Sequence, residues 1–549
     1  MKLRQKMCVA SFVGLLAAFT ANAHLMATED GLSGLQQPAI PIRSRSSTQA
    51  EVRPNVGDQS AAAMGQPGHH LTAMKNRPNV LFIAVDDLRP VLGCYGDATA
   101  VTPHLDRLAS RGTVFQHAYC QQALCSPSRL SLLTGKRPDT TRVWDLSTHF
   151  REALPDTVTL PQFFKQHGYQ TQGIGKIFHG NGKPASDPPS WTHEPLLAVN
   201  RDPKMRYALA KNLQGSGLKR SASESADVPD STYIDGQVCE AALERLTEFK
   251  TADRPFFLAV GFRKPHLPFC APRRFWQLYD RTDISPPAHP THPTNAPELA
   301  TRSWRELEGY TDIPSDGKLS SAKIQQLRHG YYACVSYIDA QIGRILKHLS
   351  ELNLADNTLI VVWGDHGFHL GEQRLWTKAN NYELSTRVPL IVTLPRKTSG
   401  TAASSGSRTS CSKLVELVDL YPTLAETCGL PLPRGLEGTS FYPLLKNPEQ
   451  AWKPAAFSQH PRDTTSNRHK GHGEIMGYAV RTGRYRYVEW RKWKSGKVID
   501  RELYDYTTSG TETDNCVGAP QYAQAQQKLE KLLAAGWEHA KPPVQKHIE

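Results

Sequence analysis

Acidic residues stand directly after two apolar, strand-like runs of the sequence. Asp86 and Asp87 follow VLFIAV, and Asp365 with His366 follows TLIVVW and one glycine. In open α/β sheets, ligands bind just outside the carboxyl ends of the strands, so these side chains are expected to converge. Three carboxylates in one place repel one another unless a cation neutralises them, and we expect Ca²⁺, with Mg²⁺ as the second choice. Taken singly, each Asp is better explained as the cap of a turn.

A cysteine opens the segment CSPSRLSLLTG, which is typical of the start of a helix. Pro127 suits a first helical turn, so Cys125 is expected at the positive end of the helix dipole, where an anion is stabilised. Arg129 lies one turn further on and faces the same side. The thiol is therefore a candidate nucleophile, although most unpaired cysteines are small buried residues that perform no reaction.

Four further polar residues follow predicted strands or the acidic loop. Lys176 and His179 lie three positions apart after an apolar run and can point into one cleft, but without other signals a solvated loop is the better interpretation. His266 stands between prolines beyond another strand, a position that fits a proton donor or a structural turn. Lys378 follows the acidic loop and by itself is an ordinary surface lysine.

The elements that must position these residues alternate from Arg77 onward. Apolar runs predict buried strands at 80–85, 256–262, 358–363 and 388–394. Helical patterns, each ended by a glycine, lie at 104–111 and 160–167. Apolar residues three and four apart predict one long helix with this stripe: Ile324, Leu327, Tyr331, Cys334, Ile338, Ile342, Ile345 and Leu349. The order indicates an α/β fold with a large, mostly parallel central sheet flanked by helices.

We expect four parts along the chain. Residues 1–23 have a basic start, an apolar run and small residues before His24, which is the pattern of a secretory signal peptide. Residues 24–76 lack apolar periodicity and predict a disordered leader. The α/β pattern marks a catalytic domain over 77–450. Short aromatic strands followed by a polar helix mark a small C-terminal α+β subdomain with an antiparallel sheet over 451–549.

Composition and charge limit the class of protein. The chain has 549 residues, is 39% hydrophobic and carries a net charge of +13. These values exclude a mostly disordered chain and favour an anionic partner, without choosing among nucleic acid, membrane surface and sulfated sugar. No stretch after the signal peptide is long enough to span a membrane, and no nucleic-acid-binding motif is recognised. Removal of Cys8 with the signal leaves an odd number of the 10 cysteines, so we expect at least one to be unpaired or modified.

The pattern C-x-P-x-R-x-x-x-L-T-G at 125–135 is a family signature, and with it the chain resembles the type I sulfatases of the alkaline phosphatase superfamily. Other stretches are similar to the iduronate-type branch of that family. They are VDDLRP at 85–90, GKIFH at 175–179, VGFRKPHLPF at 260–269, GDHGFHLG at 364–371, FSQHPR at 457–462 and IMGY at 475–478. The resemblance covers roughly residues 79–506, nearly all of the expected globular chain.

This resemblance implies an enzyme that removes 2-O-sulfate from uronic acid (iduronate-type) residues of sulfated glycans, in glycosaminoglycan degradation. It implies that a maturation enzyme oxidises Cys125 to Cα-formylglycine, which would account for the odd cysteine. It also implies one Ca²⁺ held by Asp86, Asp87, Asp365, His366 and an oxygen of the modified residue. His366 stands where most sulfatases have Asn, and imidazole is an unusual ligand for a hard cation.

The resemblance also implies catalytic roles. Arg129, Lys176 and Lys378 are expected to stabilise the charge that spreads over the sulfate. His266, together with Lys378, is expected to protonate the departing sugar oxygen, because an alkoxide is a poor leaving group at neutral pH. His179 is expected to remove the proton whose loss regenerates the aldehyde and releases sulfate.

Alternatives remain open at this level. A sulfatase of different specificity or a phosphonate monoester hydrolase would share the signature, and a non-catalytic polyanion-binding protein would use the positive charge alone. Cationic side chains are expected to bind the uronate carboxylate. The sequence offers five candidates and ranks none above another: Arg263, Lys264, Arg468, Lys470 and His472. The chain is expected to be exported, to the periplasm, the extracellular space or the lysosome, without stable membrane insertion.

Overall fold

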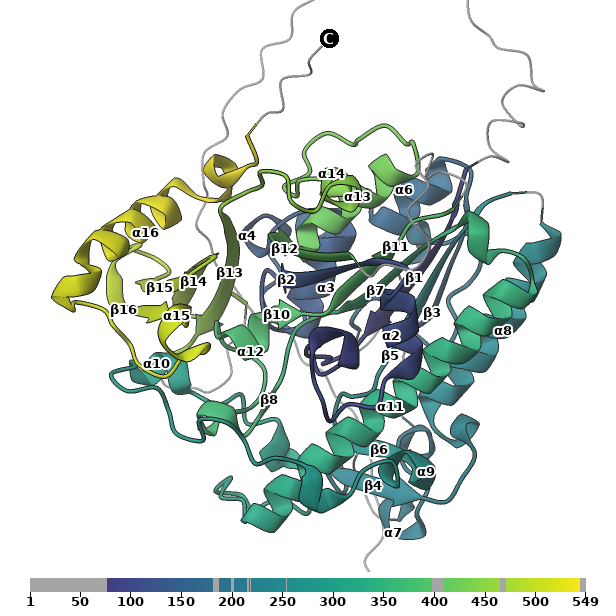
Figure 1. The fold of residues 1–549 in the computed structure, drawn as a ribbon, viewed down its shortest axis with the longest axis horizontal. Helices are drawn as coiled ribbons and strands as arrows, with labels where there is room; N and C mark the ends of the chain where they lie inside the picture. The colour runs from purple at the N-terminus through teal and green to yellow at the C-terminus, as the bar shows by residue number, and fades with distance from the viewer. Residues whose placement is uncertain are drawn as a thin grey trace, which may run out of the picture. The chain divides into compact units, whose positions relative to one another are not determined.

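A central eight-stranded sheet forms the middle of the fold (Figure 1). The computed structural model describes residues 77–543, apart from 181–186, 199–201, 215, 216, 218, 253, 397–408 and 465–470. The chain divides into the units Met1–Met64 and Gly65–Glu549, and every described residue belongs to the second. The expected signal peptide 1–23 and leader 24–76 lie outside the described residues.

The strand order is β10-β2-β11-β7-β1-β5-β3, with β12 paired to β2. The bounds are β1 (Asn79–Val85), β2 (Thr113–Tyr119), β3 (Gln170–Gly175), β5 (Phe256–Phe262), β7 (Thr358–Gly364), β10 (Arg387–Val388), β11 (Leu390–Thr393) and β12 (Thr409–Glu416). β1 pairs in parallel with β5 and β7, and β3 with β5, whereas β10 and β11 pair antiparallel with their neighbours. The expected mostly parallel α/β sheet is confirmed.

Helices cover both faces of this sheet (Figure 1). One hydrophobic core joins Leu81 and Ile83 of β1 to α2 (Pro103–Ala109), α8 (Ile234–Thr251) and α11 (Ser321–Glu351). The other joins Phe82 of the same strand to α3 (Cys125–Thr134), α6 (Leu160–Gln166) and α13 (Leu420–Thr427). Alternate residues of β1 therefore face opposite layers, as strand geometry requires. The long helix expected over 324–349 is confirmed as α11.

The run 388–394, expected to be one strand, is divided in two. Pro389 separates β10 from β11, because proline has no N–H to donate to a ladder of hydrogen bonds. The two pieces pair antiparallel with β2 on either side of this proline.

The expected antiparallel sheet near the C-terminus has the order β13-β14-β15-β16. Its strands are β13 (Ala455–Arg462), β14 (Ile475–Thr482), β15 (Tyr485–Lys492) and β16 (Val498–Asp505), followed by α15 (Tyr506–Ser509) and α16 (Ala523–Ala535). The remaining strands are β4 (Ser223–Ala226), β6 (Phe269–Pro272), β8 (His369–Leu370) and β9 (Trp376–Thr377). The remaining α-helices are α4 (Pro138–Thr141), α5 (Phe150–Ala153), α7 (Ala210–Leu213), α9 (Arg273–Trp276), α10 (Glu298–Thr301), α12 (Glu383–Thr386) and α14 (Tyr442–Lys446).

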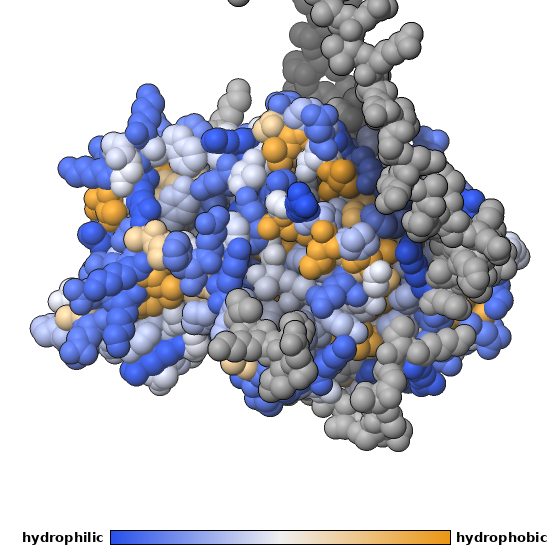
Figure 2. Space-filling model, turned by 90° about the horizontal axis from the view of Figure 1, so that it is seen from above, coloured by the Kyte–Doolittle hydropathy of each residue, from blue (hydrophilic) through white to orange (hydrophobic). Residues whose placement is uncertain are grey.

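One face of the protein is largely hydrophilic. Figure 2 shows the face seen from above in Figure 1, where hydrophobic side chains form small areas among hydrophilic ones. Within the described ranges, no helix combines the length and the apolar character that a membrane crossing needs.

The cysteines of the described residues are all unpaired. Cys94, Cys120, Cys125, Cys239, Cys270, Cys334, Cys411 and Cys428 are buried, and Cys516 is half-buried. An odd number of cysteines therefore does not single out Cys125, and the case for its modification rests on its position.

Candidate active site

The pairing of β1 with β7 brings the acidic residues together. Val85 lies opposite Gly364 in this parallel pair, so Asp86 and Asp365 leave the sheet side by side. The backbone N–H of Asp87 donates to Asp365 Oδ1 at 3.0 Å, which ties the two strand ends to each other. The expected convergence of these side chains at the carboxyl edge of the sheet is what the fold produces.

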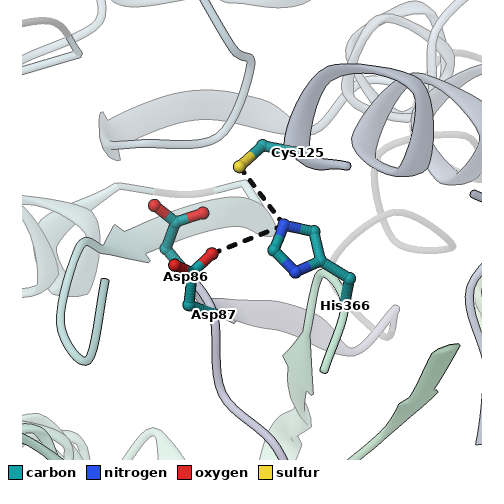
Figure 3. Close-up of side chains that lie close together, drawn as sticks. All are labelled: Asp86, Asp87, Cys125 and His366. Carbon is teal, nitrogen blue, oxygen red and sulfur yellow. Dashed lines mark hydrogen bonds and ion pairs between the residues drawn. The ribbon is translucent and has the colours of Figure 1, made fainter. Parts of the chain in front are cut away.

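Cys125 is the first residue of α3 and is only 1% exposed. Its Sγ lies 3.2 Å from His366 Nε2 (Figure 3). Burial, together with the nearby charge of Asp86, raises the pKa of the Cys125 thiol well above its ordinary value. The unmodified side chain is thus a neutral thiol and a poor nucleophile, in spite of its place at a helix N-terminus.

Arg129, one turn further along α3, holds the carboxylates in place. Its Nη2 lies 3.1 Å from Asp86 Oδ1 and its Nε 2.9 Å from Asp365 Oδ2. Its Nη1 donates to the carbonyl oxygens of Lys176 and Ile177. All three guanidinium nitrogens of this fully buried side chain are engaged, so Arg129 fixes the geometry of the strand ends.

Two lysines pair with the acidic residues from opposite sides. Lys176, which follows β3, forms an ion pair with Asp86. Lys378 Nζ lies 3.0 and 2.9 Å from the two oxygens of Asp87 and 2.9 Å from Glu306 Oε2. Although burial opposes the charge, Asp87 and Glu306 hold the pKa of Lys378 well above its ordinary value, so this ammonium keeps its proton.

His266 lies beside the same acidic group. Its Nδ1 contacts the Leu267 carbonyl oxygen at 2.6 Å, and its Nε2 is 3.3 Å from Glu306 Oε1 and 4.0 Å from Asp87 Oδ2. Burial and the neighbouring Lys378 lower the pKa of His266 well below its usual value. Of the two expected proton donors, Lys378 is therefore the one that carries its charge in the structure.

Glu306 is a site residue that sequence reasoning missed. Its carboxylate joins Lys378 to His266. Burial works to raise its pKa, but its cationic neighbours, Lys378 foremost, hold the pKa below its ordinary value. It stands in the segment RSWRELEGY, outside any strand end or motif, so a single sequence offers no signal for it.

His179 has two unused ring nitrogens. Neither Nδ1 nor Nε2 has a hydrogen-bond partner among the described residues, although both atoms are buried. Burial, together with Lys176, lowers the pKa of His179 well below its ordinary value, so the ring is neutral and can accept a proton. An unpaired buried imidazole is costly unless a ligand completes it.

A cavity of about 390 Å³ opens beside this cluster. Asp86, Lys176, His179, His266 and Glu306 are among the residues that line it. Of the five cations expected to read the sugar, Arg263 and Lys264 line the cavity as well. His472 instead stacks on Trp493 with ring centroids 4.3 Å apart, and Arg468 and Lys470 lie outside the described residues. Arg206 and Lys219, which sequence reasoning missed, complete the cationic lining.

Four expected metal ligands form one group. Ligand atoms of Asp86, Asp87, Cys125 and His366 all lie within 4.8 Å of one another (Figure 3). His366 Nδ1 contacts the Gly367 carbonyl oxygen at 3.0 Å, which leaves the lone pair of Nε2 toward Cys125 and Asp87. Asp365, the fifth expected ligand, borders the group, with its Oδ2 3.7 Å from His366 Nε2.

The charges of this cluster fit a divalent cation. Four carboxylates, of Asp86, Asp87, Glu306 and Asp365, meet three cationic side chains, of Arg129, Lys176 and Lys378. Burial, reinforced by the neighbouring carboxylates and opposed by Lys378, raises the pKa of Asp87 well above its ordinary value. A bound divalent ion would relieve this repulsion, and an oxygen in place of the Cys125 sulfur would make the donor set harder and better suited to Ca²⁺.

A mixed sheet with an acidic, lysine-flanked site at its carboxyl edge fits a hydrolase of anionic esters, and the comparisons identify the family. The sequence matches the Sulfatase family over residues 78–430, so the chain belongs to that family and hydrolyses sulfuric esters. Residues 371–538 match "N-sulphoglucosamine sulphohydrolase, C-terminal".

The similar proteins include a particular enzyme. Iduronate 2-sulfatase of Homo sapiens is 36% identical over 470 residues, which cover 75% of this chain and 84% of that protein. The Mus musculus enzyme of the same name gives 36% identity over 471 residues, with the same coverage. A solved structure of a 2-O GAG sulfatase has a TM-score of 0.60 at 22% identity, covering 84% of this chain and 92% of the other. The phosphonate monoester hydrolase of Agrobacterium radiobacter has a TM-score of 0.66 at 22% identity, covering 86% and 98%. These structures share the fold.

Proposed function

We propose that this sulfatase removes 2-O-sulfate from uronic acid (iduronate-type) residues of sulfated glycans, with formylglycine at position 125 and Ca²⁺ beside it. The observation that carries the proposal is the position of Cys125, at the start of α3 and 3.2 Å from His366 in the buried acidic cluster. The identity with iduronate 2-sulfatases supports the choice of substrate.

Two groups would complete the site. Asp86, Asp87, Asp365 and His366 would hold Ca²⁺, whose charge would lower the pKa of a hydroxyl at position 125 and offset that of the sulfate. Formylglycine, as its hydrate, would supply one hydroxyl to attack sulfur and a second whose deprotonation releases sulfate. A serine or thiol offers no second hydroxyl, so its ester would need a separate water.

The side chains of the chain itself bind and move protons around the sulfate. Lys176 and Lys378 face the anion as cations, and Arg129 keeps Asp86 in position from behind. Lys378 holds a proton at Nζ for the leaving sugar oxygen, with His266 beside it, and the free ring nitrogens of His179 accept the proton that is lost on sulfate release.

The maturation enzyme must reach Cys125 before the chain folds. The side chain is 1% exposed and lies under the carboxylates, so an enzyme cannot reach its Cβ in the folded protein. We therefore propose that oxidation takes place on the unfolded chain. The segment 1–23 would direct export, and the division into a catalytic domain over 77–450 and a subdomain over 451–549 belongs to the same proposal.

Mass spectrometry of the peptide that contains Cys125, from active protein, tests the modification. We expect the mass of formylglycine, and a thiol throughout a fully active preparation would refute the mechanism. Cys125→Ala should fold but lose activity by roughly 10³-fold or more.

A substrate panel tests the specificity. It should contain a 2-O-sulfated uronide, a 6-O-sulfated hexosamine, an aryl sulfate and a phosphonate monoester. The proposal requires the highest kcat/KM for the uronide. A preference for the hexosamine or the phosphonate would assign the site to another specificity of this fold.

A further inference from the structure

Two arginines that the proposed reaction does not use line the cavity beside the acidic cluster. Arg206 ends the 3-10 turn Pro203–Met205, and Arg263 directly follows β5. Both side chains line the cavity that also reaches Lys176 and His179. We propose that Arg206 and Arg263 form a subsite for a carboxylate on the same sugar that bears the scissile sulfate. This inference rests on the proposed function, because it assigns the second anionic group of that substrate.

Neither guanidinium has a carboxylate partner among the described residues. Arg206 forms no side-chain hydrogen bond or ion pair there. The Nη2 of Arg263 donates to the Ala198 carbonyl oxygen at the long distance of 3.4 Å. Burial lowers the pKa of Arg263, the charge of Asp235 opposes this effect, and the like charge of Arg206 adds to it. A bound anion would convert this repulsion into two favourable contacts.

Asp235 is the carboxylate whose charge acts most on Arg263, but its oxygens are engaged by the backbone. Its two carboxylate oxygens accept from the backbone N–H groups of Arg263 at 2.6 Å and of Lys264 at 3.1 Å. Asp235 therefore fixes the main chain after β5 and leaves the guanidinium of Arg263 to the cavity.

The other cations that line the cavity are already committed. Lys176 pairs with Asp86. Lys264 Nζ donates to the carbonyl oxygens of His266 and Pro268 at 3.0 and 2.6 Å. Lys219 Nζ donates to the Glu306 carbonyl oxygen at 2.8 Å and lies 5.0 Å from the centre of the Tyr310 ring. The two arginines are thus the cavity cations best placed to bind an additional anion.

A carboxylate is the anion that this pair fits best. Guanidinium is planar and weakly hydrated, and its fork of donors matches the two oxygens of a carboxylate. Met205, Ile234 and Tyr310 line the same space and give an apolar surface for a sugar ring. The proposed function places the sulfate beside Lys176 and His179, so the cavity offers different chemistry to the two anions of a sulfated uronide.

Binding to the Cys125→Ala chain tests the subsite without turnover. Calorimetry would compare a 2-O-sulfated methyl iduronide with its carboxyl methyl ester, which keeps the sulfate and loses the negative charge. We expect the acid to bind roughly 10-fold tighter or more. Arg206→Gln and Arg263→Gln, added singly, should weaken binding of the acid by roughly 10-fold to 100-fold and change that of the ester by less than about 3-fold, as for loss of a hydrogen bond to a charged group.

Two controls accompany these variants. Arg111→Gln alters an exposed arginine outside the cavity and should leave both dissociation constants unchanged. Arg263→Lys keeps the charge without the fork and should recover part of the affinity, which a merely structural role would not predict.

The outcomes separate the subsite from the reaction. The subsite proposal would be overturned if acid and ester bound with equal affinity, or if neither bound. It would also be overturned if the arginine variants lost affinity equally for both. If the acid binds through the arginines but the wild-type enzyme does not desulfate it, the subsite stands and the proposed function fails.

Discussion

Lys378 and Glu306 form an ion pair inside the active site, with Nζ 2.9 Å from Oε2. The other oxygen of Glu306 lies 3.3 Å from His266 Nε2, so one carboxylate contacts both side chains that the proposed function assigns to the leaving group. Glu306 acts through these two residues and is a positioning residue.

The Glu306→Gln variant should therefore discriminate between leaving groups. A sugar alkoxide needs a proton from Lys378 or His266, whereas a nitrophenolate leaves without one. We expect kcat for the sugar sulfate to fall by roughly 10-fold to 100-fold and that for 4-nitrophenyl sulfate by less than about 3-fold. Glu308→Gln, two residues away on the same segment, is the matched control. Equal losses on both substrates would reduce Glu306 to a structural role.

Arg129 should be essential to stability as well as to activity. Replacement by Met leaves the buried Asp365 without its arginine partner and leaves Asp86 with Lys176 alone. Breaking a buried ionic network in this way costs about 3–5 kcal/mol of unfolding free energy. Chemical denaturation measures it, with the exposed Arg111→Met as the control. A loss below about 1 kcal/mol would show that water or an ion replaces the guanidinium.

Chelation should destabilise the mature enzyme. The carboxylates around Asp87 outnumber the cationic side chains, so removal of a bound divalent ion restores their repulsion. We expect EGTA to abolish turnover and to lower the melting temperature by about 2 °C or more, and Ca²⁺ to restore both more completely than Mg²⁺. Asp87→Asn should make the melting temperature insensitive to EGTA. Full activity and an unchanged melting curve in EGTA would exclude a calcium site.

Glu502 should make the chain more stable in mild acid than in mild base. Burial raises the pKa of this carboxyl to about 7 from a reference value of 4.5, against the effect of hydrogen bonds from Tyr504, Trp490 and Tyr382. Its contribution is therefore fully present below pH 4.5 and is lost as the pH rises through about 7. The shift corresponds to about 3 kcal/mol at most.

The Glu502→Gln variant isolates this effect. It stays neutral at every pH, so the difference in unfolding free energy between pH 5 and pH 8 should shrink relative to wild type. Urea denaturation at the two values measures it, and Glu530→Gln on α16 serves as a half-exposed control. An unchanged pH dependence would show that Glu502 is hydrated and titrates normally.

The sequence predicts the part of the site that is built from strand ends and a helix start. Asp86, Asp365 and Cys125 are recognisable because parallel strands end at one edge and the signature begins a helix. Glu306 and Arg206 are different, since each lies in an irregular segment whose path depends on packing far along the chain. The sequence of an irregular segment has no periodic pattern from which its path could be predicted. Only the folded structure shows which of its side chains reach the site.

The same limit applies to details of the fold. The parallel core and α11 follow from hydrophobic patterns, which depend on local sequence. The break at Pro389 is visible in the sequence, but the reversal of β10 and β11 depends on how the chain returns to the sheet, which local patterns do not encode.

The register between β1 and β7 sets a strict rule for altering this enzyme. Val85 faces Gly364, and side chains alternate between the two layers along each strand. Insertion or deletion of one residue within β1 would move the side chains on one side of the change to the opposite helical layer. It would also turn Asp86 away from Asp365. Variants designed to change the specificity of the enzyme should therefore preserve strand length and vary the segments that carry Arg206 and Glu306.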